Sequence, residues 1–355
     1  MNFGGRAPAT MRCKNCSAGL TVTPGERAIQ CPQCHCVTRV RRGMRLPLPS
    51  APVPVAPMGM GMGMGFPSPR GKKRAVLIGI SYAGMRRGYG ELRGPINDAK
   101  CMRQFLCQRF GFPSDCVLML TDDQKDPFRL PTKDNIRMAM RWLVQGCSYG
   151  DSLVFHFSGM GVQVADDDGD EVDGMDEAIC PLDSFQRGPI LDDEINEAIV
   201  RPLVHGVKLH AVVDACHSAT VLDLPFLCRI SRSGNWQWED HRPLSGAFKG
   251  TCGGQAMLIS GYSDGKSKLS VMPDAFASVG AMTHSFIRVV ECEPRGVTYG
   301  RLLTSMKAIM REGGACNLQG PIGAPIRKVT NFSGVQEPTL SSSEMFDIYR
   351  KAFVL

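Results

Sequence analysis

In the sequence "KLHAVVDACHSAT" (residues 208–220), an apolar run leads into Asp214 and Cys216. A second stretch, "DSLVFHFSGMG" (residues 151–161), has the same form and ends in a Ser-Gly turn. Continuous apolar runs of this length are typical of strands buried on both faces of a parallel sheet. Ligands and reactive groups collect at the carboxyl ends of such strands, so both motifs are expected at one edge of a single sheet.

Apolar runs alternate with amphipathic segments from Arg74 onward. Strands are predicted at residues 74–82, 116–120, 151–159, 208–216 and 254–262, and helices at 97–110, 132–147, 192–204, 280–290 and 299–312. Asn97 or Asp98 is a good capping residue for the first helix, and Thr132 for the second. Strands that alternate with helices predict an α/β fold, with a mostly parallel β-sheet sandwiched between helices.

The overall composition indicates a globular chain with a basic N-terminal region. The 355 residues are 43% hydrophobic and 7% aromatic and carry a net charge of +7, which is ordinary for a globular protein. Much of the positive charge lies in the first hundred residues. This region either binds nucleic acid or acidic surfaces or is a solvated arm; we expect the arm, because interleaved aromatic residues are scarce there.

The sequence shows neither a secretory signal nor an apolar run long enough for a membrane span. Fifteen cysteines without such a signal indicate a reducing compartment. We therefore expect a chain that works in the cytoplasm, with the nucleus as a second location, and without membrane association.

Four cysteines near the N-terminus have the spacing of a metal site. "CKNC" and "CPQC" supply Cys13, Cys16, Cys31 and Cys34, and two such pairs can close a tetrahedral, structural zinc site. Residues 11–37 are therefore predicted to form a small zinc-binding finger that needs the metal to fold.

Residues 38–73 separate this finger from the rest of the chain. They are rich in Pro, Gly and Met, a composition that resists helix and sheet and indicates a linker. Alternatively, Met60, Met62 and Met64 engage a partner protein.

Cys216 is the candidate nucleophile, with a core cysteine at a strand end as the alternative. Its neighbour His217 is poorly placed as a base, because adjacent side chains diverge at a strand end. A carboxylate at Asp214 would hinder thiolate formation, so it makes better sense as a binding group for a cationic side chain. Asp98 either joins Asp214 there or only caps its helix.

The motifs identify residues 74–355 as similar to the caspase-like catalytic domain of metacaspases. They are "RAVLIGISY", "LRGPINDAK", "FHFSGMG", "DDDGDEVDGMDEAICPLD", "DACHSATVLDLPF", "SGYSDGKS", "GAMTHSFI" and "EPTLSSSEMFDIY". Residues 11–37 resemble the zinc finger of the lesion-simulating-disease type. Finger, linker and catalytic domain in this order resemble plant type I metacaspases.

The resemblance implies a calcium-stimulated cysteine endopeptidase that cleaves after Arg or Lys, is linked to cell death and stress, and acts as a monomer. It implies protein or peptide substrates, and contacts with cell-death regulators through the finger. Cys216 matches the family's nucleophile. The pocket for the basic side chain matches Asp98, Ser158 and Asp214. The calcium site matches Asp176, Asp192, Asp193 and Asp223, whose hard oxygen ligands suit Ca²⁺. The acidic run at 166–173 is expected to be a solvated loop.

Three positions depart from the family pattern. The histidine base falls on Met160, and His156 matches an earlier, non-catalytic histidine. Pro95 replaces a cysteine of the pocket wall. Lys266 and Lys268 add positive charge after the fifth predicted strand, where they either oppose a basic substrate or lie on a surface loop.

Met160 is the departure with the largest expected effect. A thioether cannot exchange a proton near neutral pH, so the sequence predicts a peptidase with impaired catalysis. The alternative is a non-catalytic regulator of other metacaspases or cell-death factors, which uses the retained pocket and the finger.

Overall fold

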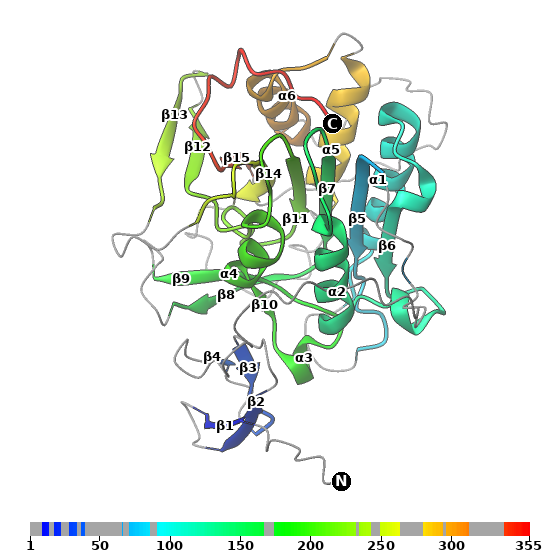
Figure 1. Cartoon of the computed structure of the whole chain (residues 1–355), viewed down its shortest axis with the longest axis vertical. Coiled ribbons are helices and arrows are strands. Elements are labelled where there is room, and N and C mark those ends of the chain that lie inside the picture. The colour runs from blue at the N-terminus through cyan, green and yellow to red at the C-terminus, as the bar shows by residue number, and fades with distance from the viewer. Residues whose placement is uncertain are drawn as a thin grey trace, which may run out of the picture.

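The computed structural model describes most of residues 71–311 and the C-terminal segment, together with parts of the N-terminal unit (Figure 1). The described ranges are 9–13, 18–22, 28–33, 37–39, 66, 71–85, 91–166, 174–231, 234–242, 249–262, 280–293, 296–311 and 337–355. In the N-terminal unit, two antiparallel pairs are formed by β1 (Ala9–Arg12) with β2 (Gly19–Val22) and β3 (Ala28–Gln30) with β4 (Val37–Arg39).

An eight-stranded sheet forms the centre of the molecule, in the order β13-β12-β15-β14-β11-β7-β5-β6. Its parallel strands are β5 (Lys73–Gly79), β6 (Val117–Thr121), β7 (Ser152–Ser158), β11 (Lys208–Asp214) and β14 (Gln255–Tyr262). Its antiparallel strands are β12 (Phe226–Ile230), β13 (Trp236–Asp240) and β15 (Glu337–Ser342). The predicted mostly parallel sheet is confirmed, as are its five strands.

Helices cover both faces of this sheet (Figure 1). One face is covered by α1 (Pro95–Phe110), α5 (Ala281–Cys292) and α6 (Tyr299–Arg311), whose apolar side chains share one core cluster. The other face is covered by α2 (Lys133–Val144) and α4 (Asp192–Ile195), which continues as a π-helical turn over Asn196–Val200. The described residues also form short helical elements, α3 (Ser184–Arg187) and 3₁₀ turns at Ser114–Cys116 and Pro127–Arg129.

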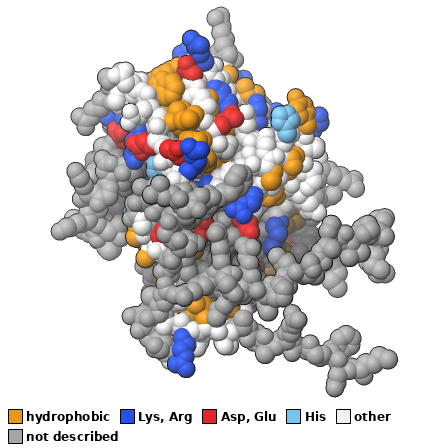
Figure 2. All heavy atoms as spheres, turned by 60° about the vertical axis from the view of Figure 1, so that its left-hand side comes forward, with side chains coloured by type: hydrophobic (Ala, Val, Ile, Leu, Met, Phe, Trp, Pro, Cys, Tyr) orange, Lys and Arg blue, Asp and Glu red, His pale blue; other side chains and the backbone are white. Residues whose placement is uncertain are grey.

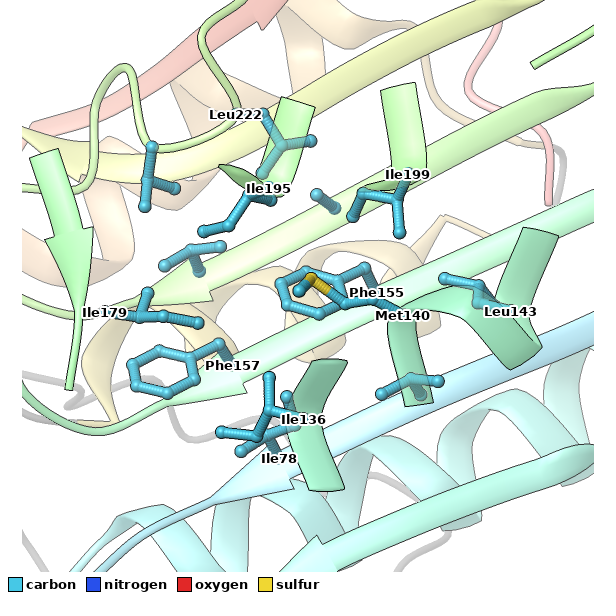
Figure 3. Packing of buried hydrophobic residues seen from close by; sticks show 14 of the residues in the cluster. Ile78, Ile136, Met140, Leu143, Phe155, Phe157, Ile179, Ile195, Ile199 and Leu222 are labelled. Carbon is cyan, nitrogen blue, oxygen red and sulfur yellow. The ribbon is translucent and has the colours of Figure 1, made fainter. Parts of the chain in front are cut away.

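The sheet alternates its side chains between two apolar cores. Phe155 and Phe157 of β7 point into the cluster under α2 and α4, together with Ile136 and Ile195 (Figure 3). Val154, which precedes Phe155 and points to the opposite side of β7, faces the cluster under α1 and α5. This period of two fixes which polar residues of β7 and β11 face α5.

A small sheet and the antiparallel edge were not predicted. The small sheet consists of β8 (Gly161–Ala165), β9 (Met175–Ile179) and β10 (Ile190–Leu191). The edge strand β13 carries Glu239 and Asp240, which form ion pairs with Arg229 of β12 and with Arg242 just after β13. Acidic and basic side chains are mixed on the face of the molecule shown in Figure 2. Charges along an edge strand discourage pairing with another chain.

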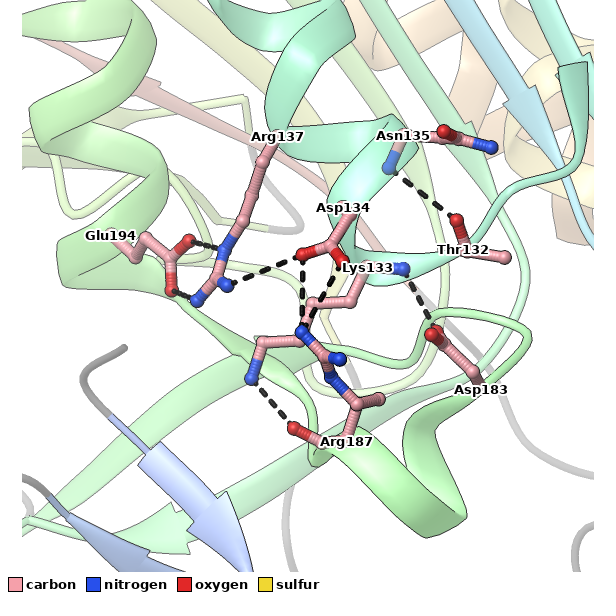
Figure 4. Close-up of polar contacts among 8 residues, drawn as sticks. All are labelled: Thr132, Lys133, Asp134, Asn135, Arg137, Asp183, Arg187 and Glu194. Carbon is pink, nitrogen blue, oxygen red and sulfur yellow. Dashed lines mark hydrogen bonds and ion pairs between the residues drawn. The ribbon is translucent and has the colours of Figure 1, made fainter. Parts of the chain in front are cut away.

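A polar network fixes α4 against α2 (Figure 4). Arg137 donates two hydrogen bonds to Glu194, of 2.5 and 2.9 Å. Thr132 caps α2 as predicted, because its Oγ1 accepts the backbone N–H of Asn135 at 3.4 Å. The start of α4, where Asp192 lies, is therefore held in place by a bidentate ion pair. Among the described helices, none combines the length and apolar character needed to cross a bilayer.

Candidate active site

Two carboxylates and a serine meet at the carboxyl end of the parallel strands. Ser158, the last residue of β7, is the register partner of Asp214, the last residue of β11. Ser158 Oγ donates a hydrogen bond of 2.8 Å to Asp98 Oδ2, which reaches the site from the first turn of α1. All three side chains are buried. The structure thus brings together the three residues that were predicted to form a pocket.

The interpretation of Asp98 as a helix cap is wrong. α1 begins two residues earlier than its strongest capping residues suggest, with Gly94 at the capping position and Pro95 in its first turn. Proline suits this position because the first N–H groups of a helix have no partner within it. The carboxylate of Asp98 is therefore free of a capping role and faces Ser158.

The N-terminus of α5 holds the second carboxylate. Thr283 N donates a hydrogen bond of 2.8 Å to Asp214 Oδ2, and the nearby backbone N–H groups of Gly280 and Met282 help to lower the pKa of this carboxyl. Gly280 has a left-handed backbone with φ of 101°, and a Cβ there would lie 3.2 Å from Asp98 Oδ1. A glycine at this position therefore lets the helix start close to both carboxylates.

The carboxylates of Asp98 and Asp214 are buried close together and repel each other when both are charged. Burial, and then the charge of Asp214, raises the pKa of Asp98, while its bond from Ser158 opposes the shift. Burial also raises the pKa of Asp214, against the backbone hydrogen bonds from α5. Two like charges that are desolvated together favour a bound cation or a shared proton. The arrangement can therefore receive a positively charged side chain.

Cys216 lies just beyond this pair and reaches the surface. Partial burial of the thiol, followed by the charge of Asp214, raises the pKa of Cys216, so the thiolate is disfavoured. His217 adopts a left-handed backbone with φ of 51°, and burial lowers its pKa. In the described part of the chain, no hydrogen bond joins the Cys216 thiol to a base.

The turn after β7 runs against the Cys216 segment. Gly159 N donates to Asp214 O at 3.3 Å, and a Cβ on Gly161 would collide with Cys216 O. Between them, the backbone N–H of Met160 donates to the Tyr82 hydroxyl at 3.1 Å, and that hydroxyl donates to Cys180 O at 2.6 Å. The Met160 side chain is 8% exposed and packs in the core under α2 and α4.

His156 cannot serve as a base in place of Met160. Its side chain is fully buried on the α5 side of β7, and its Nε2 lies 3.0 Å from Thr283 Oγ1. Burial lowers the pKa of His156 to about 3, so the ring is neutral at physiological pH.

The four carboxylates predicted to bind calcium come from neighbouring segments. Asp192 Oδ2 accepts the backbone N–H of Glu177 at 2.9 Å, which places Asp192 beside Asp176. Asp193 follows at the start of α4, half-buried. In the part of the chain that the structure describes, no three His, Cys, Asp or Glu side chains approach closely enough to hold one metal ion.

Asp223 has a buried cation of its own. Lys249 Nζ lies 2.5 Å from Asp223 Oδ1, and both side chains are less than 10% exposed. Asn196 donates to the backbone carbonyl groups of Leu222, Asp223 and Lys249 and so fixes this pair beside α4. The oxygens of the four predicted carboxylates suit calcium by their chemistry, but Lys249 already neutralises the carboxylate of Asp223.

Two of the four predicted zinc ligands, Cys13 and Cys31, are described and buried. They lie at the ends of β1 and β3 and pack with the apolar side chains of Leu20 and Ile29. Thiolates in this setting suit zinc. Cys16 and Cys34 lie outside the described residues, as do Lys266, Lys268 and residues 167–173.

Sequence reasoning missed Thr283, Tyr82 and Lys249. The first two belong to stretches that the sequence singled out, "GAMTHSFI" and "RAVLIGISY", but their contacts lie far away along the chain. Thr283 meets a residue 127 positions earlier, and Tyr82 one 98 positions later. Nothing in the sequence indicated that Lys249 pairs with Asp223.

Comparisons with known proteins show the family to which the chain belongs. The profile described as "Metacaspase, peptidase C14 domain" matches residues 73–225. Metacaspase-1 of Arabidopsis thaliana is 48% identical over 98% of this chain and 97% of its own length. Metacaspase-3 of the same plant is 48% identical over 97% and 98%, and Metacaspase-2 is 48% identical over 81% and 74%. With its buried carboxylate pair beside a strand-end cysteine, the chain belongs to the metacaspase family of C14 peptidases, whose substrates are proteins.

Proposed function

We propose that this metacaspase is an Arg/Lys-directed cysteine endopeptidase with low turnover, in which Met160 stands at the position of the family's histidine base. The observation that carries the proposal is the buried pair Asp98 and Asp214 beside Cys216. A guanidinium or ammonium group would relieve the repulsion between these carboxylates. A substrate with Arg or Lys before the cleaved bond then presents its carbonyl carbon to Cys216.

The chemical step lacks a proton carrier. Cys216 Sγ attacks the carbonyl carbon of the substrate, and the leaving amine needs a proton to depart. The thioether of Met160 neither accepts nor donates that proton. Because a positioned general acid–base contributes about 10²- to 10⁴-fold, amide cleavage is the step that suffers most.

Calcium is proposed as the activating ion. Its ligands would be Asp176, Asp192, Asp193 and Asp223, which supply hard oxygen donors from β9, α4 and the segment after β11. The support is the backbone hydrogen bond that joins Asp192 to β9 and the network that joins Asp223 to α4. Bound calcium would supply positive charge that holds these acidic segments together.

The N-terminal unit is proposed as a structural zinc finger of a type I metacaspase. Two thiols from each CxxC pair would hold the ion, and the burial of Cys13 and Cys31 supports this. We further propose that the finger contacts cell-death regulators and that the chain acts as a monomer in the cytoplasm, with the nucleus as a second location.

A non-catalytic regulator is the second candidate function. It is favoured by the packing of Met160 into the core and by the raised pKa of the Cys216 thiol, which forms no hydrogen bond with a base among the described residues. In that role the pocket would bind basic segments of other metacaspases or of cell-death factors without cleaving them.

Cleavage of paired fluorogenic peptides tests the proposal. The full chain with calcium is given peptides that differ only in Arg or Asp before the reporter, next to the Cys216→Ala variant. We expect slow release from the Arg peptide alone and none from the variant. Equal cleavage of both peptides would contradict the pocket assignment. No cleavage, with tight binding of the Arg peptide, would favour the regulator.

A further inference from the structure

His156 and Asp214 contact the same residue of α5 from neighbouring strands. His156 precedes Ser158 by two residues, so the two side chains lie on the same side of β7, the side that faces α5. His156 Nε2 lies 3.0 Å from Thr283 Oγ1. Thr283 also donates its backbone N–H to Asp214, at 2.8 Å. The Thr283 side chain, beside the same carboxylate, also lowers the pKa of Asp214. A single threonine therefore joins the buried histidine to the pocket.

The hydrogen-bond directions follow from the number of protons. A threonine hydroxyl has one hydrogen to donate and two lone pairs. If that hydrogen goes to the carboxylate of Asp214, which only accepts, then His156 must be the donor in its bond to Thr283. The neutral ring therefore carries its hydrogen on Nε2. His156 Nδ1 is buried without a hydrogen-bond partner among the described residues.

We propose that His156 is a positioning residue of the substrate pocket: through Thr283 it fixes the hydroxyl that orients and stabilises the carboxylate of Asp214. The inference rests on the proposed function, in which Asp214 binds the basic side chain. His156 then acts on substrate affinity and not on the reactivity of Cys216. This gives a role to the histidine that β7 retains, although it is sealed off from the thiol.

The relay is the path from His156 through Thr283 to Asp214. It matters because Asp98 and Asp214 differ in the polar groups that stabilise their charged forms. Asp214 accepts the backbone N–H of Thr283, and the backbone N–H groups of Gly280 and Met282 and the Thr283 side chain also lower its pKa, whereas for Asp98 only the bond from Ser158 does so. Asp214 is therefore the carboxylate that is held ionised for a cation. The polar groups that stabilise the charge of Asp214 set how strongly the pocket attracts a guanidinium or ammonium group.

Benzamidine, which mimics an arginine side chain, measures the pocket without catalysis. Its dissociation constant is determined by calorimetry on the full chain and on His156→Leu, His156→Gln and Thr283→Val. We expect a loss of roughly 3- to 10-fold in affinity for His156→Leu and Thr283→Val, as for one hydrogen bond. His156→Gln, which keeps an N–H donor, should recover most of it. The double variant should lose no more than either single variant, because both break the same relay.

His210 provides a matched control. It is equally buried, faces the same side of the sheet from β11, and lies 2.6 Å from the Tyr299 hydroxyl instead of near the pocket. His210→Leu should lower thermal stability and leave benzamidine affinity unchanged. An equal loss of affinity in His210→Leu would mean that His156 acts only through general stability.

The pH profile gives a second readout. Benzamidine binds the ionised pair, so affinity falls as pH drops through its titration. Without His156 the Thr283 hydroxyl is no longer held in place and stabilises the charge of Asp214 less, which raises the pKa of Asp214, so this fall should occur at higher pH in His156→Leu. The other titratable groups that face the pair in the described elements are Cys101 of α1 and Cys216. Burial raises the pKa of both thiols, so they stay neutral throughout.

Three outcomes separate the possibilities. Native affinity and an unshifted pH profile in a folded His156→Leu variant would overturn the inference while leaving the basic pocket intact. Absence of benzamidine binding by the native chain would overturn the proposed pocket itself. If His156→Leu does not fold, Thr283→Ser against Thr283→Val decides: equal affinity in these two variants would show that the hydroxyl has no role.

Discussion

The charge of Asp214 favours the binding of a cation but disfavours the thiolate of Cys216. Its carboxylate, held by the N-terminus of α5, is the better placed of the pair to bind a cation. The same charge raises the pKa of the Cys216 thiol. A histidine base would offset this cost by taking the thiol proton, and the described residues around Cys216 offer none. At the scale of single residues, the site favours binding over chemistry.

Replacement of Asp214 should therefore make Cys216 more reactive. Asp214→Asn removes a negative charge that disfavours the thiolate, so the pKa of Cys216 should fall and its alkylation by iodoacetamide at pH 7.5 to 8.5 should be faster. The rate is followed on the Cys216 peptide by mass spectrometry, because the chain has fifteen cysteines. Asp98→Asn is the control and should have a smaller effect, since Asp98 does not contribute to the shift at Cys216. Slower alkylation in Asp214→Asn would contradict the account.

Elements bring the site together through parallel pairing, and this part was predictable. The apolar runs that become β7 and β11 end at Ser158 and Asp214, and their register makes these two residues neighbours. The antiparallel strands β12, β13 and β15 were missed because they are short, and β15 pairs with segments that are distant in the chain. The start of α1 was missed because Gly94 and Pro95 outweigh the capping residues that follow.

The elements around the proposed calcium site lead to a prediction about Lys249. Its ammonium group neutralises Asp223, so a divalent cation has to displace it. Without calcium, Lys249→Met removes the ammonium group that pairs with the buried Asp223 carboxylate and should lower the free energy of unfolding by about 3–5 kcal/mol. Calcium should restore much of this, so the calcium-induced rise in Tm should be larger in Lys249→Met than in the native chain.

Lys307→Met is the matched control for this prediction. Lys307 forms an ion pair with Glu337 on the α6 side of the molecule, away from the acidic segments. Its replacement should leave the calcium-induced rise in Tm unchanged. Equal rises in the native chain, Lys249→Met and Lys307→Met would contradict the role of Lys249.

The whole molecule combines a predictable scaffold with contacts that only the folded chain reveals. Strand periodicity was sufficient for the α/β sandwich, and the grouping of Asp98, Ser158 and Asp214 followed from the resemblance to metacaspases. They were insufficient for the environment of Met160, because its neighbours Tyr82 and Cys180 come from separate segments. The domain boundaries and metal sites stay predictions. The central claim is that pocket and nucleophile are present while the proton carrier is missing.

The decisive measurement is the hydrolysis of a matched pair of substrates, an Arg amide and an Arg ester. It compares the native chain with the Met160→His and Cys216→Ala variants. Amide cleavage needs an acid to protonate the leaving amine, so Met160→His should raise kcat/KM for the amide by about 10²- to 10⁴-fold. The ester, whose leaving group needs less assistance, should gain about tenfold or less. Cys216→Ala should abolish both activities. A native amide rate equal to that of Met160→His, and lost in Cys216→Ala, would contradict the account.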